Sequence, residues 1–225
     1  MPGFRAEEGT YVAALAADDA AELLVLGHPR RFPHGTTLFT QGDNADRVFI
    51  ITDGRVKIFS HTDEGREIVL GVRGPGDVVG DMSALDGSPR LASARAMSDV
   101  AAVTIGVEPL LSFLDSHPKA SMALLRTLVA RQRDADEKRM EYLSHDSVGR
   151  LARRLVELAE RYGEPEDTTI TIDLQLTQEE LAAWTGSSRE ATTKALQSFR
   201  SSGLIETRRR KIIILDIEKL KRRAI

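Results

Sequence analysis

The sequence has no cysteine among its 225 residues, one tryptophan and few aromatic residues overall. The lack of cysteine excludes disulfides, thiolate zinc sites and cysteine-ligated iron–sulfur clusters. The five histidines are scattered without the spacing of metal ligands, so we predict no metal site. No apolar run approaches the roughly 20 residues of a membrane helix, and no signal peptide is recognisable. We therefore expect a soluble, cytoplasmic protein that does not associate with a membrane.

The sequence has little excess charge of either sign, since its formal net charge is −3, but the charges are unevenly placed. Residues 1–145 carry 16 lysines and arginines against 21 aspartates and glutamates, whereas residues 189–225 carry 11 against 4. A basic C-terminal end is suited to contact the phosphates of a nucleic acid. The length is sufficient for two domains, each with its own core.

Short runs of β-forming residues fill the stretch from 31 to 107, separated by glycine next to aspartate or glutamate. Such dipeptides favour tight turns, and strands this short at this spacing indicate an antiparallel barrel or roll. The predicted strands are 37–39, 47–51, 56–59, 68–70 and 101–105.

Residues 119–148 contain neither glycine nor proline, and their apolar residues recur at helical spacing. This predicts one long helix, whose apolar stripe is interrupted by Gln132, Asp136 and Arg139. We expect part of it to pair with a second copy of the chain; the alternative is a helix folded back on its own roll. A break at Ser144 and His145 is the predicted hinge. A further helix up to Tyr162, an exposed acidic loop over 163–167 and a strand over 169–174 are predicted to follow.

The run from 177 to 204 has the pattern of two helices joined by a sharp turn. Thr177 and Glu180 form a capping box for the first helix, and Gly186 permits the turn. Ser187 or Ser188 caps the second helix. Its predicted inner side is Ala191, Ala195, Leu196 and Phe199, and its outer side is Arg189, Glu190, Thr192, Thr193, Lys194 and Gln197.

This pattern predicts a helix-turn-helix that binds double-stranded DNA, because such a second helix presents its first residues to base edges in the major groove. Arg189 pairs with guanine, Glu190 accepts from cytosine, and Lys194 reaches guanine or phosphate. Other polar groups at the helix starts and on the outer face contact the DNA beside them. They are Thr177, Gln178, Ser188 and Thr192. The basic segment that begins at Glu206 is predicted to be a hairpin whose tip lies on the DNA backbone.

With these residues identified, the chain from Arg31 onward resembles the cyclic-AMP receptor protein/fumarate-nitrate regulator (CRP/FNR) family, and most closely its actinobacterial members. The similarity lies in the roll glycines, the stretch 80–90, the segment 145–150 and the Ser188-Arg-Glu sequence. The resemblance implies a homodimeric transcription regulator that reads a two-fold symmetric operator, with a TGTGA-like half-site. It also implies a contact between RNA polymerase and the loop over 163–169.

The resulting fold class is α+β. It comprises an N-terminal β-roll of the cyclic-nucleotide-binding, jelly-roll type, a long dimerisation helix and a C-terminal winged helix-turn-helix. The predicted domains are a sensory roll over 1–117, the dimerisation helix with its hinge over 118–145, and the DNA-binding domain over 146–225. The sequence identifies no cofactor with certainty, and cyclic AMP is a candidate that we disfavour.

The resemblance also places a ligand pocket, and there the chain departs from the pattern of cyclic-nucleotide binders. The corresponding residues are Gly80, Asp81, Met82, Arg90, Leu91, Ala135 and Asp136. Arg90 matches the arginine that binds the phosphate in the family. Asp81 is one methylene shorter than the family's glutamate, and Leu91 has no hydroxyl to offer the phosphate. Ala135 cannot donate or accept at a base-contacting position. We therefore expect a degenerate pocket. The alternative interpretation of Arg90 is a structural ion pair with an acidic neighbour such as Asp81 or Asp86, which would leave the pocket closed and empty.

Three alternatives remain at this stage. A true cyclic-AMP-dependent regulator is the first. The second is an architectural DNA-binding protein without an effector, for which Arg189 and Glu190 would have no reading role. The third is an enzyme that carries the roll as a regulatory module. The enzyme is disfavoured, because the helix-turn-helix directly follows the long helix and leaves no residues for a catalytic domain.

Overall fold

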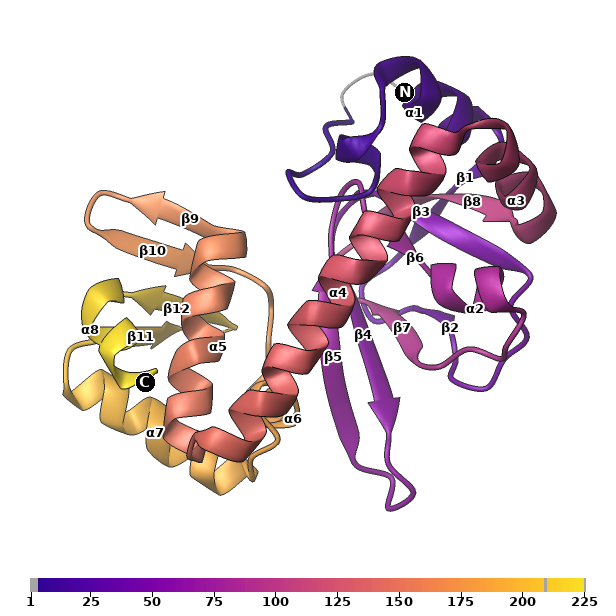
Figure 1. Ribbon diagram of the computed structural model, residues 1–225. Helices are drawn as coiled ribbons and strands as arrows, with labels where there is room; N and C mark the ends of the chain where they lie inside the picture. Colours follow the sequence, from indigo (N-terminus) through magenta and orange to yellow (C-terminus); the bar gives the residue numbers. More distant parts are fainter. Residues whose placement is uncertain (1–3, 209, 225) are drawn as a thin grey trace. The chain divides into compact units, whose positions relative to one another are not determined.

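The computed structural model describes residues 4–208 and 210–224. The chain divides into two compact units: Met1–His61 with Leu70–Asp134, and Thr62–Val69 with Ala135–Ile225. We call them the N-terminal unit and the C-terminal unit and describe each by itself. Figure 1 labels their elements along the chain.

The N-terminal unit is a roll of two four-stranded sheets with order β1-β8-β3-β6 and β2-β7-β4-β5. All five strands predicted from the sequence are present, and the α+β class with an N-terminal roll is confirmed. The elements are η1 (Val12–Ala14), α1 (Ala17–Val25), β1 (His28–Phe32), β2 (Thr37–Phe39), β3 (Arg47–Asp53), β4 (Val56–His61), β5 (Glu67–Arg73), β6 (Val78–Val79), α2 (Asp81–Asp86), β7 (Ser93–Ala96), β8 (Val100–Gly106) and α3 (Val107–Ser116).

Strand β3 is apolar on both faces because it separates two layers of core. Phe49 and Ile51 point between the two sheets, while Val48 and Ile50 point to the opposite face, where residues of α1, α3 and α4 pack. Side chains alternate along a strand, so a continuous apolar run is the pattern of a strand covered on both sides.

Three strands that the sequence pattern did not predict, β1, β6 and β7, complete the sheets. Strand β1 contains Pro29 and pairs only with β8, which makes it an edge strand, where a missing backbone N–H is tolerated. Strand β7 pairs with β2 and β4. Its small residues Ser93, Ala94 and Ala96 are buried but lack the β-branched character that identifies a strand.

Helix α4 (Pro118–Ser144) is continuous over 27 residues, as the sequence predicted, and ends at the predicted break. The next helix, α5 (Ser147–Tyr162), begins with a cap from Asp146, whose carboxylate accepts from the backbone N–H of Gly149 at 2.7 Å. Such a cap satisfies one of the free N–H groups at the helix start.

The C-terminal unit combines α5 with three further helices and a sheet of order β11-β12-β10-β9. Its remaining elements are β9 (Gly163–Glu166), β10 (Thr169–Ile172), α6 (Gln178–Thr185), α7 (Arg189–Ser201), β11 (Ile205–Arg208), β12 (Lys211–Ile214) and α8 (Ile217–Arg223). The prediction of a loop over 163–167 is wrong, because four of these residues form β9 and pair with β10. Within the described residues, none of the helices combines the length and apolar character that a membrane crossing requires.

Candidate nucleic-acid interface and ligand pocket

The turn between α6 and α7 has the geometry that the sequence predicted. Gly186 ends α6 with φ of 58°, in the left-handed region that glycine adopts without strain. Ser188 then caps α7, because its hydroxyl accepts from the backbone N–H of Ala191 at 3.1 Å. Arg189, Glu190 and Lys194 lie in the first two turns of α7 and are exposed. The start of α7 therefore presents one acidic and two basic side chains to solvent.

The inner side of α7 anchors the helix to the unit. Ala195, Leu196 and Phe199 are buried, as predicted. The prediction that Thr192 lies on the outer face is wrong, because its side chain is only 2% exposed. Thr192 precedes Ala195 by three residues and Leu196 by four, so it shares their face of the helix. Its hydroxyl has no partner in the described residues and is not available to DNA.

The start of α6 carries the predicted capping box. The Thr177 hydroxyl accepts from the backbone N–H of Glu180 at 3.1 Å, and the Glu180 carboxylate accepts from the backbone N–H of Thr177 at 2.9 Å. Gln178 is exposed, and its side-chain oxygen accepts from the Thr193 hydroxyl at 3.0 Å. The starts of the two helices are thus held beside each other through polar side chains.

Two of the three residues expected to read bases, Arg189 and Glu190, already have side-chain partners in the structure. Arg189 pairs with Glu179 across the two helix starts at 2.9 Å, and both side chains are about two-thirds exposed. Glu190 accepts from its own backbone N–H and from the Ser188 hydroxyl, and these bonds lower the pKa of its carboxyl. The Glu190 carboxylate is therefore ionised at neutral pH and able to accept from a base.

The predicted basic hairpin is formed by β11 and β12. Arg208 and Arg210 are exposed near its tip, whereas Lys211 pairs with Asp173 at 2.5 Å. Arg209, which the sequence also placed at the tip, lies outside the described residues.

In the N-terminal unit, Arg90 is buried against backbone rather than against a carboxylate. Its guanidinium donates to the carbonyl oxygens of Gly80, at 2.7 Å, and of Arg47, and its carbon lies 4.4 Å from the centre of the Phe39 ring. Only 3% of Arg90 is exposed, and this burial lowers the pKa of its guanidinium. Its Nε has no partner in the described residues.

Asp81 is engaged by an arginine that sequence reasoning missed. Arg131 on α4 donates to the carboxylates of Asp81 at 2.6 Å and Asp77 at 3.1 Å, and to the carbonyl oxygen of Val78 at 3.0 Å. The predicted pairing of Arg90 with Asp81 is therefore wrong, because Asp81 is directed to Arg131 instead. The other predicted partner, Asp86, accepts from the backbone N–H of Ser88 at 2.9 Å.

The remaining predicted pocket residues are divided between the two units. Gly80, Asp81 and Met82 lie at the start of α2, but Met82 is 54% exposed, and Leu91 is 63% exposed. Ala135 is half-buried, and Asp136 is exposed and pairs with Arg139 at 2.9 Å within α4. Both belong to the C-terminal unit. In residues 4–208 and 210–224, no three histidine, aspartate or glutamate side chains gather as metal ligands.

Comparison with known proteins matches both units. Residues 29–117 match the "Cyclic nucleotide-binding domain", and residues 149–223 match the "Crp-like helix-turn-helix domain". A "CRP-like cAMP-activated global transcriptional regulator" of Mycobacterium tuberculosis is 38% identical over 87% of this chain and 88% of its own. The chain belongs to the CRP/FNR family. It is a DNA-binding transcription regulator, and the family is one of regulators rather than enzymes.

Other members of the CRP/FNR family show the same relation. A "Cyclic AMP receptor protein" of Thermus thermophilus is 30% identical over 85% of each chain. The solved structure of a c-di-GMP responsive global regulator from Xanthomonas campestris superposes with a TM-score of 0.79 at 26% identity, covering 89% of this chain and all of that one. The effectors for which these relatives are named differ, so family membership by itself does not identify the ligand of a member.

Proposed function

We propose that the chain is a sequence-specific regulator in which Arg189, Glu190 and Lys194 read the bases of its operator. The observation that carries this proposal is the start of α7. There, a serine cap and a left-handed glycine expose these three side chains in the first two turns. Arginine pairs bidentately with guanine, and glutamate accepts from the amino group of cytosine. The preferred half-site is TGTGA-like, as the family resemblance implies. Thr177, Gln178 and Ser188 contact phosphates beside it.

The regulator acts as a homodimer that pairs through α4. Met122, Leu125, Val129 and Leu143 fall on the first and fourth positions of one heptad frame along this helix. Between 46% and 91% of each of these side chains is exposed, although all four are apolar. A second α4 packed along this stripe would cover them. A dimer presents α7 twice, which fits an operator with two-fold symmetry.

We further propose that the cyclic-nucleotide pocket is degenerate and does not respond to cyclic AMP. Arg131 engages Asp81, the residue that would have to accept from a ribose hydroxyl. Leu91 has no hydroxyl to offer a phosphate. Each missing charge-assisted hydrogen bond weakens the binding free energy of the ligand by about 1.5–3 kcal/mol. Isothermal titration calorimetry with cyclic AMP tests this: we expect no binding at millimolar or lower concentration, and a micromolar Kd would refute it.

A second candidate, true cyclic-AMP dependence, is favoured by one observation. Arg90 is buried without a carboxylate partner, and its Nε is unsatisfied among the described residues. A buried cation of this kind is suited to an anion such as a phosphate. The same calorimetric titration decides between the two candidates.

RNA polymerase is the proposed protein partner, and the hairpin of β9 and β10 is the proposed contact surface. Glu164, Glu166 and Asp167 are exposed on it. Their replacement by alanine should lower transcription from a regulated promoter without changing the affinity for the operator. If the alanine variant equals the wild-type protein both in operator affinity and in transcription, this hairpin is not the contact surface for RNA polymerase.

Removal of Arg189 tests the reading role directly. Arg189→Ala should lose about 1–3 kcal/mol of affinity for the operator while binding to random DNA changes little. Arg200→Ala is a matched control, because it removes the same charge from the exposed far end of α7. Equal losses on operator and random DNA would show that Arg189 supplies charge alone, as in an architectural protein.

A further inference from the structure

Two side chains next to the break between α4 and α5 enclose the turn of the helix-turn-helix. The Tyr142 ring, in the last turn of α4, lies so close to Gly186 that a Cβ built on this glycine would clash with it. The Arg150 guanidinium lies over the same ring, with its carbon 5.2 Å from the ring centre. Gly186 is thus required twice, for its left-handed φ and for the space that Tyr142 occupies.

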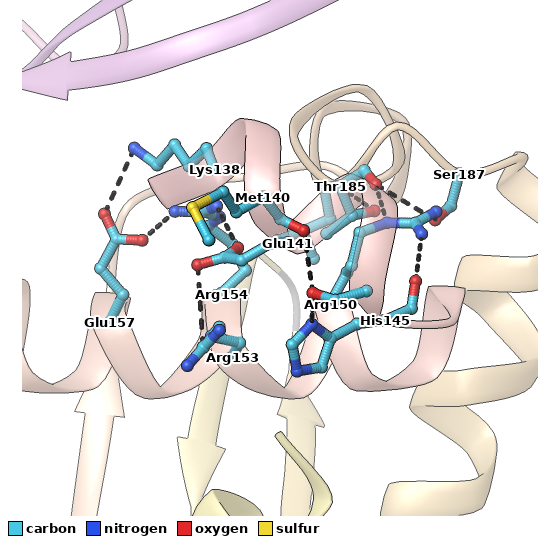
Figure 2. A network of polar contacts seen from close by, with 12 residues as sticks. Lys138, Met140, Glu141, His145, Arg150, Arg153, Arg154, Glu157, Thr185 and Ser187 are labelled. Atoms are coloured by element: carbon cyan, nitrogen blue, oxygen red, sulfur yellow. Dashed lines mark hydrogen bonds and ion pairs between the residues drawn. The ribbon is translucent and has the colours of Figure 1, made fainter. Parts of the chain in front are cut away.

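Arg150 joins three segments of the C-terminal unit through one guanidinium. Its Nε donates to the carbonyl oxygen of Thr185 at 2.9 Å, and its Nη1 donates to that of His145 at 2.7 Å (Figure 2). Its Nη2 lies 3.5 Å from the Ser187 hydroxyl. Thr185 is the last residue of α6, and Ser187 immediately precedes the cap of α7. We call Tyr142 and Arg150 together the turn clamp.

A separate set of ion pairs holds the end of α4 on α5. Glu141 lies 3.7 Å from Arg153 and 3.5 Å from Arg154, and Lys138 lies 3.6 Å from Glu157 (Figure 2). Arg154 also lies over the Trp184 ring of α6, with its carbon 5.6 Å from the ring centre, but none of these ion pairs includes a residue of the turn over 185–188. The same end of α4 is therefore fixed to α5 by charge and to the helix-turn-helix by the turn clamp.

The exposure of the clamp distinguishes it from the core of the unit. Tyr142 is 43% exposed and Arg150 is half-buried, whereas Leu151, Leu155 and Phe199 are almost completely buried. The core supplies most of the apolar burial that stabilises the fold. The clamp contacts instead the few residues whose backbone sets the direction of α7.

We propose that Tyr142 and Arg150 are positioning residues for operator recognition. This inference rests on the proposed reading role of α7. Only Ser188 separates Ser187 from Arg189, so the conformation of the turn fixes where the base-reading side chains lie. A site that reads bases must be held within about 0.5 Å of its productive geometry. When the competent orientation is only fractionally populated, the apparent affinity falls by that fraction.

The test compares Arg150→Gln with Arg153→Gln in the full-length protein. Both remove one positive charge from α5, but Arg153 does not contact the turn. The probes are a duplex selected by the wild-type protein and a random duplex at the same salt concentration. We expect Arg150→Gln to bind the selected duplex about tenfold more weakly than Arg153→Gln, and the random duplex within about twofold. Equal binding of the selected duplex by both variants would overturn the proposal, and so would equal losses on both duplexes.

Hydrogen exchange distinguishes a positioning role from a general contribution to the stability of the fold. In Arg150→Gln, the backbone amides of Ser187–Ala191 should exchange faster while those around Leu155 keep their protection. Uniformly faster exchange would indicate general destabilisation and contradict a positioning role. Should Arg150→Gln fail to fold, Tyr142→Leu serves instead, because it keeps apolar bulk and removes the ring face. Tyr142→Phe should retain wild-type selectivity.

Failure of the clamp is distinguishable from failure of the reading role. If the wild-type protein selects no sequence, the proposed function itself fails. If Arg189→Ala abolishes selectivity while Arg150→Gln and Tyr142→Leu keep it, the reading role stands and only the clamp is refuted.

Discussion

Arg189 must leave Glu179 before it can pair with a base, and this exchange gives a quantitative prediction. The two side chains lie 2.9 Å apart and are about two-thirds exposed, so solvent screens their attraction. Exposed ion pairs of this kind contribute about 0.2–1 kcal/mol. Breaking the pair opposes operator binding by the same amount. Glu179→Gln removes this competition and should raise operator affinity by about 1.4- to 5-fold beyond any general effect of charge.

The general effect of charge is removed by comparison with random DNA and with a control variant. Glu206→Gln removes one negative charge from β11 in the same unit without touching Arg189. Fluorescence anisotropy with labelled operator and random duplexes gives the ratio of the two affinities. We expect Glu179→Gln to raise this ratio and Glu206→Gln to leave it unchanged. In the Arg189→Ala background, the effect of Glu179→Gln on the ratio should disappear.

A fall in the ratio would refute this reasoning. It would mean that Glu179 holds Arg189 in its reading conformation rather than competing with DNA for it. If Glu179→Gln still raises the affinity ratio in the Arg189→Ala background, Glu179 acts on operator binding through a residue other than Arg189.

Three further predictions concern stability and assembly. Thr177→Ala should lower the free energy of unfolding by about 0.5–2 kcal/mol in urea titrations, because Glu180 loses its capping acceptor, whereas the exposed Thr193→Ala should change it little. Arg154→Leu should lower it by about 1.5–3 kcal/mol, because Glu141 and Glu157 lose their buried partner and keep only Arg153 and Lys138; an unchanged unfolding midpoint would contradict this. Leu125→Glu should shift the protein from dimer to monomer in sedimentation velocity, and a variant that stays dimeric would exclude this stripe of α4 as the interface.

The DNA-binding end was predictable from the sequence because its signals are local. Each signal involves residues at most four positions apart in the sequence. The signals are the capping box at Thr177, the turn glycine Gly186 and the serine cap at Ser188. The orientation of Thr192 was predictable in principle from its spacing to Ala195 and Leu196. The prediction failed because Thr192 was assigned by its polarity rather than by its position in the helical period.

The sensory end was less predictable because its contacts are distant in sequence. Arg131 reaches Asp81 and Asp77 across about fifty residues, through the packing of α4 on the N-terminal unit. Its only signal in the sequence was an arginine one turn before the residues expected to contact a ligand. The turn clamp was equally hidden, since no pattern in the sequence singles out Tyr142, and Arg150 was only the last residue of the family segment 145–150.

Selection of bound sequences from random duplex DNA tests the central claim most directly. The wild-type protein should enrich an inverted repeat of two half-sites whose centres lie about one helical turn, roughly 34–36 Å, apart. Arg189→Ala should lose the guanine preference in both half-sites together. Enrichment of no sequence, or of the same sequence by both proteins, would contradict the claim that α7 reads the operator.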